Sequence, residues 1–511
     1  MYKLLVSLPL LMLFLAAPTF AADAPAAATA ETPAATPVPK ESQSVTHGSV
    51  TINGKTIYYT ATAGNLLVDN DKGKAIGSFF YVAYTKNGAD LNRRPLTFLF
   101  NGGPGSSSIW LHMGSFGPVR VVTSDAKATP PPPYDLVQNQ YSLLDKSDLI
   151  FIDAIGTGFS RIVGKGTPKD FYGTDADITS FGKFIQRYVT INNRWLSPKF
   201  LLGESYGTTR AAGLADWLQQ QGIALNGVVL QSSWLNGFVD FPGPPFSLDL
   251  PYELYLPTMA AVAWYHDKLP NKPADLPAFL QQVRDFALGD YAHALSKGVN
   301  LSAADTQAIA QKLHAYTGLP VQYILNAKLR ITPDRFEKEL LRGEDRTTGR
   351  LDARFLGIDA DAAGETPAYD PSGSAIGPAF TAAFHWYLKN DLKYKTDLGY
   401  KVESYGDAAF QNWDNSQRID GQTYPLMDVE ENLRAAMTEN PHLKVFSANG
   451  YFDFATPFFE TEYDLDHMGL DPSLMKNISY AYYQSGHMIY LHVPALAKYK
   501  ADLAKFYNTA E

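Results

Sequence analysis

The hydrophobic and polar positions between residues 96 and 231 alternate between short apolar runs and longer amphipathic stretches. The short runs suit buried strands and stand at Leu96–Phe100, Leu149–Asp153, Phe200–Leu202 and Val228–Gln231. Helical patterns over about Asp175–Arg194 and Thr208–Gln221 separate the later runs. Strands that alternate with helices in this way predict an α/β fold with a doubly wound, mostly parallel sheet.

The stretch from His47 to Tyr84 has the period-two alternation of half-buried strands instead. Asn53-Gly54 separates Ser49–Ile52 from Thr56–Tyr59, and a two-residue Asn-Gly connection is typical of a β-hairpin. We therefore expect antiparallel strands at the edge of the sheet, before its parallel part.

The pattern changes again between residues 238 and 432. Helical segments rich in Ala and Leu, such as Asp275–Leu288 and Ala303–Ala315, alternate with Gly- and Pro-rich stretches, and no run has the pattern of a parallel strand. Strand-like runs return at Leu443–Ala448 and Ile478–Tyr483. We expect residues 238–432 to form a largely helical cap lobe that shapes the pocket, inserted between two parts of one core at 47–237 and 433–511.

The motif Gly203-Glu204-Ser205-Tyr206-Gly207 lies between a predicted strand and the helix that follows it. A G-x-S-x-G sequence in this setting is typical of a nucleophile elbow, in which a sharp strand-to-helix turn exposes the serine. Glycines flank the serine because a Cβ at either position would clash with the crowded backbone. The motif predicts Ser205 as a nucleophile in an α/β-hydrolase fold.

A second glycine loop follows another predicted strand. Leu96–Phe100 leads into Asn101-Gly102-Gly103-Pro104-Gly105-Ser106-Ser107-Ser108, where backbone N–H groups can approach a bound carbonyl. An α/β-hydrolase takes one oxyanion donor from such a loop and one from the residue after the nucleophile, which predicts the N–H groups of Gly103 and Tyr206. The alternatives are an ordinary Gly/Pro turn and a phosphate loop, but the G-K-[ST] and G-x-G-x-x-G patterns are missing here.

The partners of the nucleophile should follow it in the order acid, then histidine. Asp453 and His487 each come just after a predicted strand, where open α/β sheets collect their sites. The chain has ten histidines, and competing ones nearby stand beside a proline or on predicted helices: His442, His467 and His492. His487 is therefore the predicted base and Asp453 the acid that orients it.

Taken together, these motifs resemble those of the serine carboxypeptidase family (peptidase family S10). The resemblance rests on four segments that span about residues 50–505 in the family's order: Asn101–Ser108, Phe151-Ile152-Asp153 with Gly156-Thr157-Gly158-Phe159-Ser160, Gly203–Gly207, and Ser485-Gly486-His487-Met488. It implies an α/β-hydrolase that removes C-terminal residues from peptides. It also implies that Asn101, Gly102 and Glu204 bind the terminal carboxylate of the substrate, although the residue pattern alone does not distinguish Glu204 from an ordinary, partly exposed glutamate.

The chain departs from better-known members of that family in two places. They carry a disulfide-bonded cysteine after Pro-Gly, where this chain has Ser106 and no cysteine anywhere. They also tend to have a tryptophan two positions before Asn101, where this chain has Leu99. The first departure leaves open what holds the loop, and the second leaves open the preference for the leaving residue.

The resulting hypothesis is a serine-type carboxypeptidase that works through an acyl-enzyme and prefers acidic pH. A protonated Glu204 would donate a hydrogen bond to the substrate carboxylate, whereas an ionised one would repel it. The alternatives are an esterase or acyltransferase on the same scaffold, and a catalytically inactive binding protein, which would lack a member of the triad. We expect peptides with a free C-terminus as partners, and neither a metal nor another cofactor.

Composition and the N-terminal residues bear on where the protein works. A content of 45% hydrophobic and 19% charged residues fits a globular protein, and a net charge of −9 argues against nucleic-acid binding. Residues 1–21 combine Lys3, an apolar run and small residues before position 22, which predicts a signal peptide rather than a membrane span. Residues 22–46, mostly Ala, Pro and Thr, predict a flexible linker. We expect an exported protein, periplasmic or secreted, and the lack of cysteine favours a bacterial periplasm.

Overall fold

The computed structural model describes residues 36–239 and 248–510. The predicted signal peptide and most of the predicted linker therefore lie outside the described residues. The first strand begins at Gln43, so residues 43–46 belong to the sheet and not to the linker in which we predicted them.

The strands are β1 (Gln43–Ile52), β2 (Lys55–Asp69), β3 (Ala75–Lys86), β4 (Leu96–Phe100), β5 (Val119–Val121), β6 (Leu136–Gln138), β7 (Asp148–Ile152), β8 (Arg161–Ile162), β9 (Lys199–Ser205), β10 (Gly227–Ser233), β11 (Arg346–Thr348), β12 (Leu356–Ile358), β13 (Gln417–Ile419), β14 (Gln422–Tyr424), β15 (Lys444–Gly450) and β16 (Ile478–Tyr483). The α-helices are α1 (Ile109–Leu111), α2 (Thr174–Ile191), α3 (Tyr206–Gln220), α4 (Leu250–Tyr265), α5 (Leu276–Phe286), α6 (Ala292–Ser296), α7 (Ala303–Thr317), α8 (Val321–Asn326), α9 (Pro333–Glu339), α10 (Pro371–Asn390), α11 (Glu430–Glu439), α12 (Phe458–His467) and α13 (Val493–Ala510).

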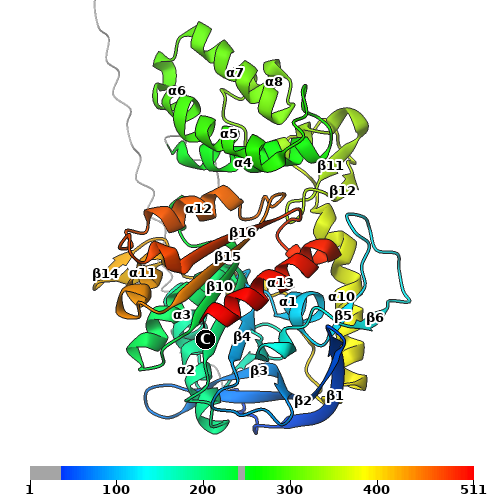
Figure 1. Cartoon of the computed structure of the whole chain (residues 1–511), viewed down its shortest axis with the longest axis vertical. Helices are drawn as coiled ribbons and strands as arrows, with labels where there is room; N and C mark the ends of the chain where they lie inside the picture. The colour runs from blue at the N-terminus through cyan, green and yellow to red at the C-terminus, as the bar shows by residue number, and fades with distance from the viewer. Residues whose placement is uncertain (1–35, 240–247, 511) are drawn as a thin grey trace, which may run out of the picture. The chain divides into compact units, whose positions relative to one another are not determined.

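A single mixed sheet organises the core, in the order β1-β2-β3-β7-β4-β9-β10-β15-β16 (Figure 1). Neighbours from β1 to β7 pair antiparallel, and neighbours from β7 to β16 pair parallel. The predicted hairpin forms as expected, with Ile52 opposite Lys55 and both Asn53 and Gly54 at positive φ. The prediction of a doubly wound, mostly parallel sheet of the α/β class is confirmed.

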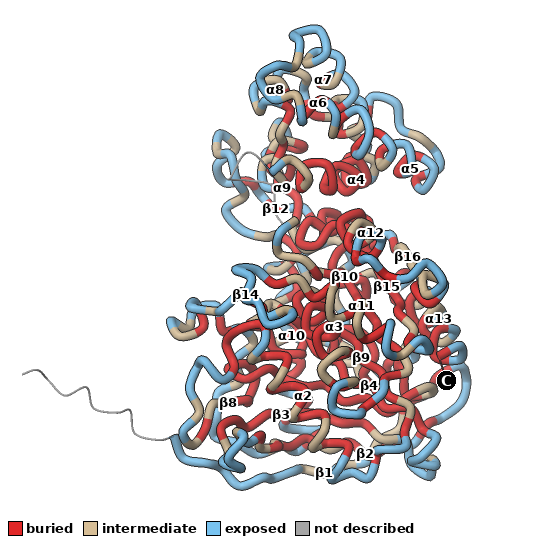
Figure 2. The backbone as a smooth tube through the Cα atoms, turned by 90° about the vertical axis from the view of Figure 1, so that its left-hand side faces the viewer, coloured by how far each residue is buried: buried red, intermediate tan, exposed pale blue. Residues whose placement is uncertain are grey.

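Successive residues of a strand point to opposite sides of the sheet, so both faces carry apolar side chains, and helices cover both. Phe98 and Leu201 pack with α2, α3 and α11 on one face. Leu99 and Leu202 pack with α1, α10 and α13 on the other. Figure 2 shows the central strands as buried along almost their whole length.

A third hydrophobic cluster joins helices of residues 238–432, the segment that we predicted as a cap, to residues after β15. Helices α4 to α9 share this cluster with Phe452 and Phe454, which follow β15. In Figure 1 helices α4 to α8 lie on the side of α12 that faces away from the sheet, and α4 contacts α12. Helix α10 comes from the same segment but packs on the sheet, so the segment supplies a separate helical layer and also one helix of the core.

The strand order places two loops at one crevice. The chain passes from β4 to β7 on one side and reaches β9 on the other side of β4. Open α/β sheets bind ligands outside the carboxyl ends of their strands at such a switch point. The loop Asn101–Ser108 follows β4, and Ser205 ends β9, so both lie there.

Backbone hydrogen bonds hold the loop after β4 in place without a disulfide. The N–H of Ser107 donates to the carbonyl of Val402 over 2.9 Å, and the N–H of Ser404 donates to that of Gly105 over 2.8 Å. The indole of Trp110 donates to Ser106 Oγ over 2.9 Å. The segment 402–404 thus acts as a short antiparallel partner for the loop.

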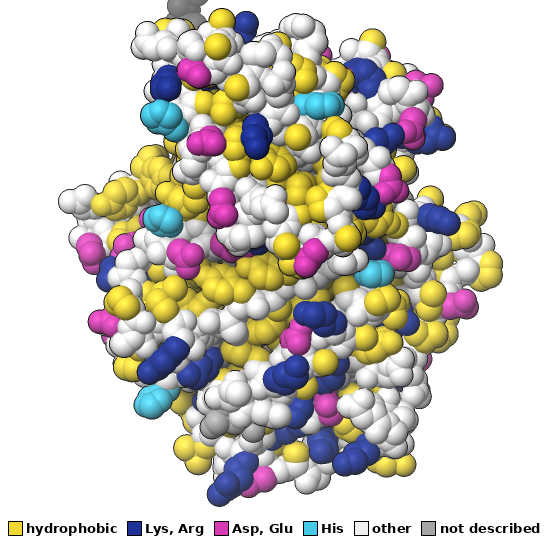
Figure 3. Space-filling model, turned by 45° about the horizontal axis from the view of Figure 1, so that its top comes forward, with side chains coloured by type: hydrophobic (Ala, Val, Ile, Leu, Met, Phe, Trp, Pro, Cys, Tyr) yellow, Lys and Arg dark blue, Asp and Glu magenta, His cyan; other side chains and the backbone are white. Residues whose placement is uncertain are grey.

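Among the described residues, no helix combines the length and the apolar character that a membrane crossing requires. On the face that Figure 3 draws, hydrophobic side chains gather across the middle of the molecule, with charged side chains of both signs on either side.

Candidate active site

Ser205 occupies a strained turn between β9 and α3. Its backbone has φ 61° and ψ −134°, in a region that a side-chain-bearing residue rarely adopts. A Cβ on Gly203 would lie 2.0 Å from the carbonyl oxygen of Gly207, and one on Gly207 would lie 2.6 Å from that of Phe100. Both glycines are therefore required by close backbone contact, as the elbow motif predicts.

The glycine loop after β4 runs beside the N-terminus of α3. A Cβ on Gly102 would lie 2.4 Å from the backbone nitrogen of Tyr206. Tyr206 is the first residue of α3, so its N–H has no partner within the helix. Gly103, at φ 110°, follows directly, and the two N–H groups predicted as oxyanion donors thus come from adjoining segments.

Asp453 and His487 form a buried hydrogen-bonded pair. The distance from His487 Nδ1 to Asp453 Oδ2 is 2.8 Å, and the exposed fractions of the two residues are 3% and 0%. Asp453 Oδ1 accepts the N–H groups of Ala455 and Thr456, at 2.8 and 3.1 Å. The hydroxyl of Thr456 donates to Oδ2 over 2.9 Å. These donors fix the carboxylate so that it orients the imidazole.

Hydrogen bonds also fix the backbone of His487. Its carbonyl oxygen accepts Ser232 Oγ at 2.8 Å and Gln231 Nε2 at 3.2 Å, and its N–H donates to the carbonyl of Leu351 over 2.7 Å. Burial lowers the pKa of His487, but the charge and hydrogen bond of Asp453 and the charge of Glu204 raise it, and the net pKa lies above the usual value. The pair can therefore store a proton on the ring, which a general base needs.

Glu204 is a fully enclosed carboxyl beside the nucleophile. Its Oε1 accepts Asn101 Nδ2 at 2.9 Å and the Tyr490 hydroxyl at 3.2 Å, and its Oε2 accepts Gln231 Nε2 at 2.8 Å. Burial is the largest influence on its pKa and, against the opposing effects of His487 and these donors, raises it to about 7. At acidic pH this carboxyl is thus neutral and able to donate a hydrogen bond.

Arg210 fixes the backbone of Asn101 by a hydrogen bond. Its Nη1 donates to the carbonyl of Asn101 over 2.8 Å, and its Nε pairs with Asp177 Oδ2 at 2.8 Å. The guanidinium lies 4.1 Å from the ring centroid of Phe181, and Arg210 is wholly buried. The Asn101 side chain also accepts the N–H of Leu111 over 2.9 Å. Asn101 therefore keeps one orientation towards Glu204.

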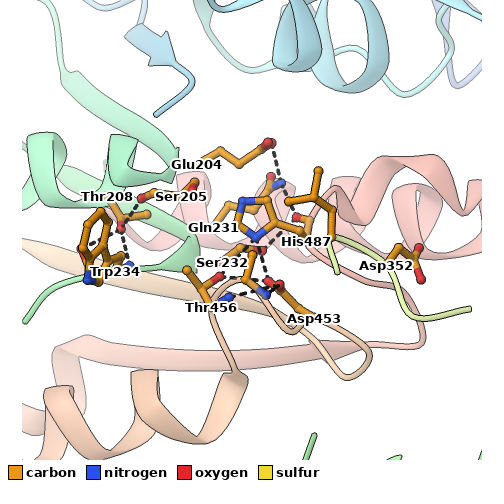
Figure 4. Close-up of polar contacts among 12 residues, drawn as sticks. Glu204, Ser205, Thr208, Gln231, Ser232, Trp234, Asp352, Asp453, Thr456 and His487 are labelled. Atoms are coloured by element: carbon orange, nitrogen blue, oxygen red, sulfur yellow. Dashed lines mark hydrogen bonds and ion pairs between the residues drawn. The ribbon is translucent and has the colours of Figure 1, made fainter. Parts of the chain in front are cut away.

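These residues line one cleft of about 610 Å³. Of the residues predicted from the sequence, those in its wall are Asn101, Gly102, Gly103, Glu204, Ser205 and His487. Asp453 lies behind His487, as Figure 4 shows, and Tyr206 begins the helix behind Ser205. The structure therefore brings the predicted site residues together.

Sequence reasoning missed the supporting residues: Thr456, Gln231, Ser232, Tyr490 and Arg210. Gln231 and Ser232 stand at the end of a predicted strand, but only the strand order shows that this strand lies beside β9 and β15. Tyr490 stands three residues after His487, within a stretch that reads as an ordinary helix start. Within residues 36–239 and 248–510, no group of His, Asp and Glu has the arrangement of a metal site.

The sheet, the strained serine and the buried acid–histidine pair define an α/β hydrolase. The family model of the serine carboxypeptidases matches residues 54–243 of this chain. The family resemblance of the motifs is thereby confirmed.

The similar proteins include the pheromone-processing carboxypeptidase KEX1 of Saccharomyces cerevisiae, 38% identical over 136 residues, or 25% of this chain and 17% of that protein. Serine carboxypeptidase-like 36 of Arabidopsis thaliana is 28% identical over 170 residues, or 32% of this chain and 33% of that protein. The alignments thus span at most a third of these relatives. A crystal structure of Kex1(delta)p, a prohormone-processing carboxypeptidase of Saccharomyces cerevisiae, has TM-score 0.54 at 14% identity and covers 88% of this chain and 91% of that one. At this low sequence identity, the similarity to the Kex1(delta)p structure is a similarity of fold.

Proposed function

We propose that this protein is a serine-type carboxypeptidase, which hydrolyses the last peptide bond of peptides with a free C-terminus through an acyl-enzyme. The observation that carries the proposal is the hydrogen-bonded pair of Glu204 and Asn101 in the same cleft as Ser205 and His487. Ester hydrolysis needs the serine, the histidine and the oxyanion donors. A buried carboxyl with a pKa of about 7 adds nothing to that chemistry, but it suits the recognition of a second carboxylate.

In the acylation step, Ser205 Oγ attacks the carbonyl carbon of the last peptide bond. His487 Nε2 takes the serine proton and then delivers it to the departing amine, while Asp453 holds the ring by Nδ1 and stabilises its positive charge. The N–H groups of Gly103 and Tyr206 stabilise the oxyanion, and one such donor typically contributes about 3–4 kcal/mol. Water, deprotonated by the same histidine, then releases the acyl group.

Asn101, the backbone of Gly102 and protonated Glu204 bind the carboxylate of the leaving residue. Protonation of Glu204 also removes one of the charges that raise the pKa of His487, so the neutral form of Glu204 favours the basic form of the histidine. We infer that kcat/KM for peptides is best at mildly acidic pH and falls as the pH rises through about 7.

A fluorophosphonate probe combined with a peptide assay tests this proposal. The wild type should be labelled and should release free amino acids from blocked dipeptides, whereas Ser205→Ala should do neither and should keep its thermal unfolding temperature within a few degrees. Asp453→Asn should retain more activity than His487→Ala, since the aspartate holds the ring and does not react. Labelling without peptide cleavage would instead indicate an esterase or acyltransferase, and no labelling would indicate a binding protein.

We further propose that the protein is exported after cleavage near Ala22, and that residues 238–432 are a cap insertion between core parts at 47–237 and 433–511. The apolar N-terminal run and the change in pattern at residue 238 support these boundaries. N-terminal sequencing of the native protein tests the export, and a chain that still begins at Met1 contradicts it.

A further inference from the structure

A second cavity, twice as large as the catalytic cleft, has no part in the chemistry described above. Its volume is about 1260 Å³, and its walls come from α4 and α6 to α9. Tyr252, Leu295 and Leu329 give it buried apolar walls, whereas Val299 stands fully exposed at its rim. The volume exceeds the range of roughly 300–1,000 Å³ that is usual for small-molecule sites, so the cavity suits a longer ligand.

Arg350 connects this cavity to the catalytic cleft, because it lines both. Its backbone is fixed between the two sites: its N–H donates to Asp370 Oδ1 over 3.1 Å, and its carbonyl accepts the N–H of Phe454 over 3.0 Å. Its charge acts on His487, whose pKa it lowers. Phe454, the residue after Asp453, belongs to the wall of the larger cavity. The larger cavity therefore adjoins the cleft on the side of Asp453 and His487.

The direction of a bound peptide follows from the two ends of the cleft. Asn101 and Glu204 line the cleft and not the larger cavity, so the C-terminal carboxylate is held away from it. An extended chain advances about 3.3–3.6 Å per residue, so residues a few positions before the cut bond reach beyond the cleft. We propose that the larger cavity binds the amino-terminal part of the substrate, so that the protein acts preferentially on peptides of several residues. This inference rests on the proposed carboxypeptidase function.

The charges around the cavity indicate which peptides fit. Its lining includes several basic side chains and one acidic one: Lys328, Arg330, Arg335, Arg350 and Asp334. Arg330 pairs with Asp249 at 2.7 Å and Arg335 with Glu365 at 3.3 Å. Lys328 is exposed at the edge. Neutral or acidic side chains in the amino-terminal part should therefore be preferred to basic ones.

A length series of substrates tests the proposal. A blocked dipeptide and a blocked hexapeptide that share the same last two residues are compared by release of the C-terminal amino acid. For the wild type we expect kcat/KM about tenfold higher for the hexapeptide, since binding of remote residues lowers the barrier at the reacting bond. Ala327→Trp, at the end of α8 in the cavity wall, should bring the hexapeptide value down to that of the dipeptide and leave the dipeptide value within about twofold.

Two further variants make the result specific. Thr306→Trp fills the cavity from α7 and should have the same effect as Ala327→Trp. If one of these two variants folds poorly, the other one still tests the proposal. Ala308→Trp places the same bulk on an exposed position of α7 outside the lining and should behave as the wild type. Equal values for both peptides in the wild type, or a length preference that survives in both tryptophan variants, overturns the inference while the proposed function stands. Absence of any peptide cleavage and of Ser205 labelling overturns both.

Discussion

Replacing Glu204 by glutamine should remove the acidic preference for peptides with a free C-terminus. With a pKa of about 7, the wild-type carboxyl is almost fully protonated at pH 5 and about one-tenth protonated at pH 8. If only the protonated form binds the substrate carboxylate, kcat/KM for such peptides loses about tenfold across this range relative to substrates without a carboxylate. Glutamine stays neutral, so this relative loss should disappear.

The surroundings of Glu204 can accept the glutamine. Two donors, from Asn101 and Tyr490, meet at Oε1, and the glutamine carbonyl oxygen can keep both. Gln231 Nε2 donates to Oε2, where glutamine would present a second amide nitrogen. Gln231 Nε2 also donates to the carbonyl of His487 over 3.2 Å, so Gln231 keeps its orientation and the variant loses one hydrogen bond, while the two at Oε1 remain.

The assay measures kcat/KM for a peptide acid and for the matching C-terminal amide between pH 5 and pH 8. Their ratio isolates Glu204, because His487 serves both substrates alike. Glu253→Gln is the matched control: burial raises the pKa of Glu253 to about 7 as well, but Glu253 does not line the cleft. We expect the ratio to fall about tenfold in the wild type and in Glu253→Gln, and to stay flat in Glu204→Gln. A wild-type ratio that is the same at both ends of the range would refute the reasoning.

Two further predictions concern stability. Arg210→Met leaves Asp177 buried without its cation, so urea denaturation should show a loss of about 3–5 kcal/mol in the free energy of unfolding, partly recovered when Asp177→Leu is added. A full loss that the second change does not reduce would mean that the ion pair is not its cause. Burial also raises the pKa of Asp153 to about 7, as it does for Glu204, so the folded state holds these protons more tightly than the unfolded chain. This stability is fully present below about pH 4 and is lost as the pH rises towards 7, by on the order of 3 kcal/mol per group, so the unfolding free energy should be higher at pH 5 than at pH 8, with a smaller difference in Asp153→Asn. An unfolding free energy that rises over this interval would contradict the assignment.

The parts of the site that depend on local backbone chemistry could be predicted from the sequence. The glycines around Ser205 and in the loop after β4 are required by contacts within each turn or with its neighbour, so the motif itself carries the information. The same holds for the hairpin at Asn53-Gly54, whose positive φ values need those residue types.

The parts that depend on distant contacts could not be predicted. Gln231 reaches His487 across 256 residues of sequence, and Tyr490 reaches Glu204 across 286, and neither contact leaves a local pattern. The sequence of helix α10 has the same Ala-rich helical pattern as the neighbouring helices in the chain. Helix α10 nevertheless packs on the sheet and not among α4 to α9. The surface on which a helix packs depends on how well the two surfaces fit each other. The apolar pattern of one helix does not give the shape of the other surface.

The hydrogen bonds between the loop at 105–107 and the segment 402–404 have a consequence for how the protein matures. A loop that is fixed by a covalent sulfur bridge becomes ordered only after an oxidant has acted, and it loosens again when a reductant is present. Here the same anchoring arises when the backbone reaches its native position, and the chain has no thiol to oxidise. The geometry of the substrate-binding loop is therefore independent of the redox poise of the surroundings, and the protein can reach its working form without a disulfide-forming catalyst.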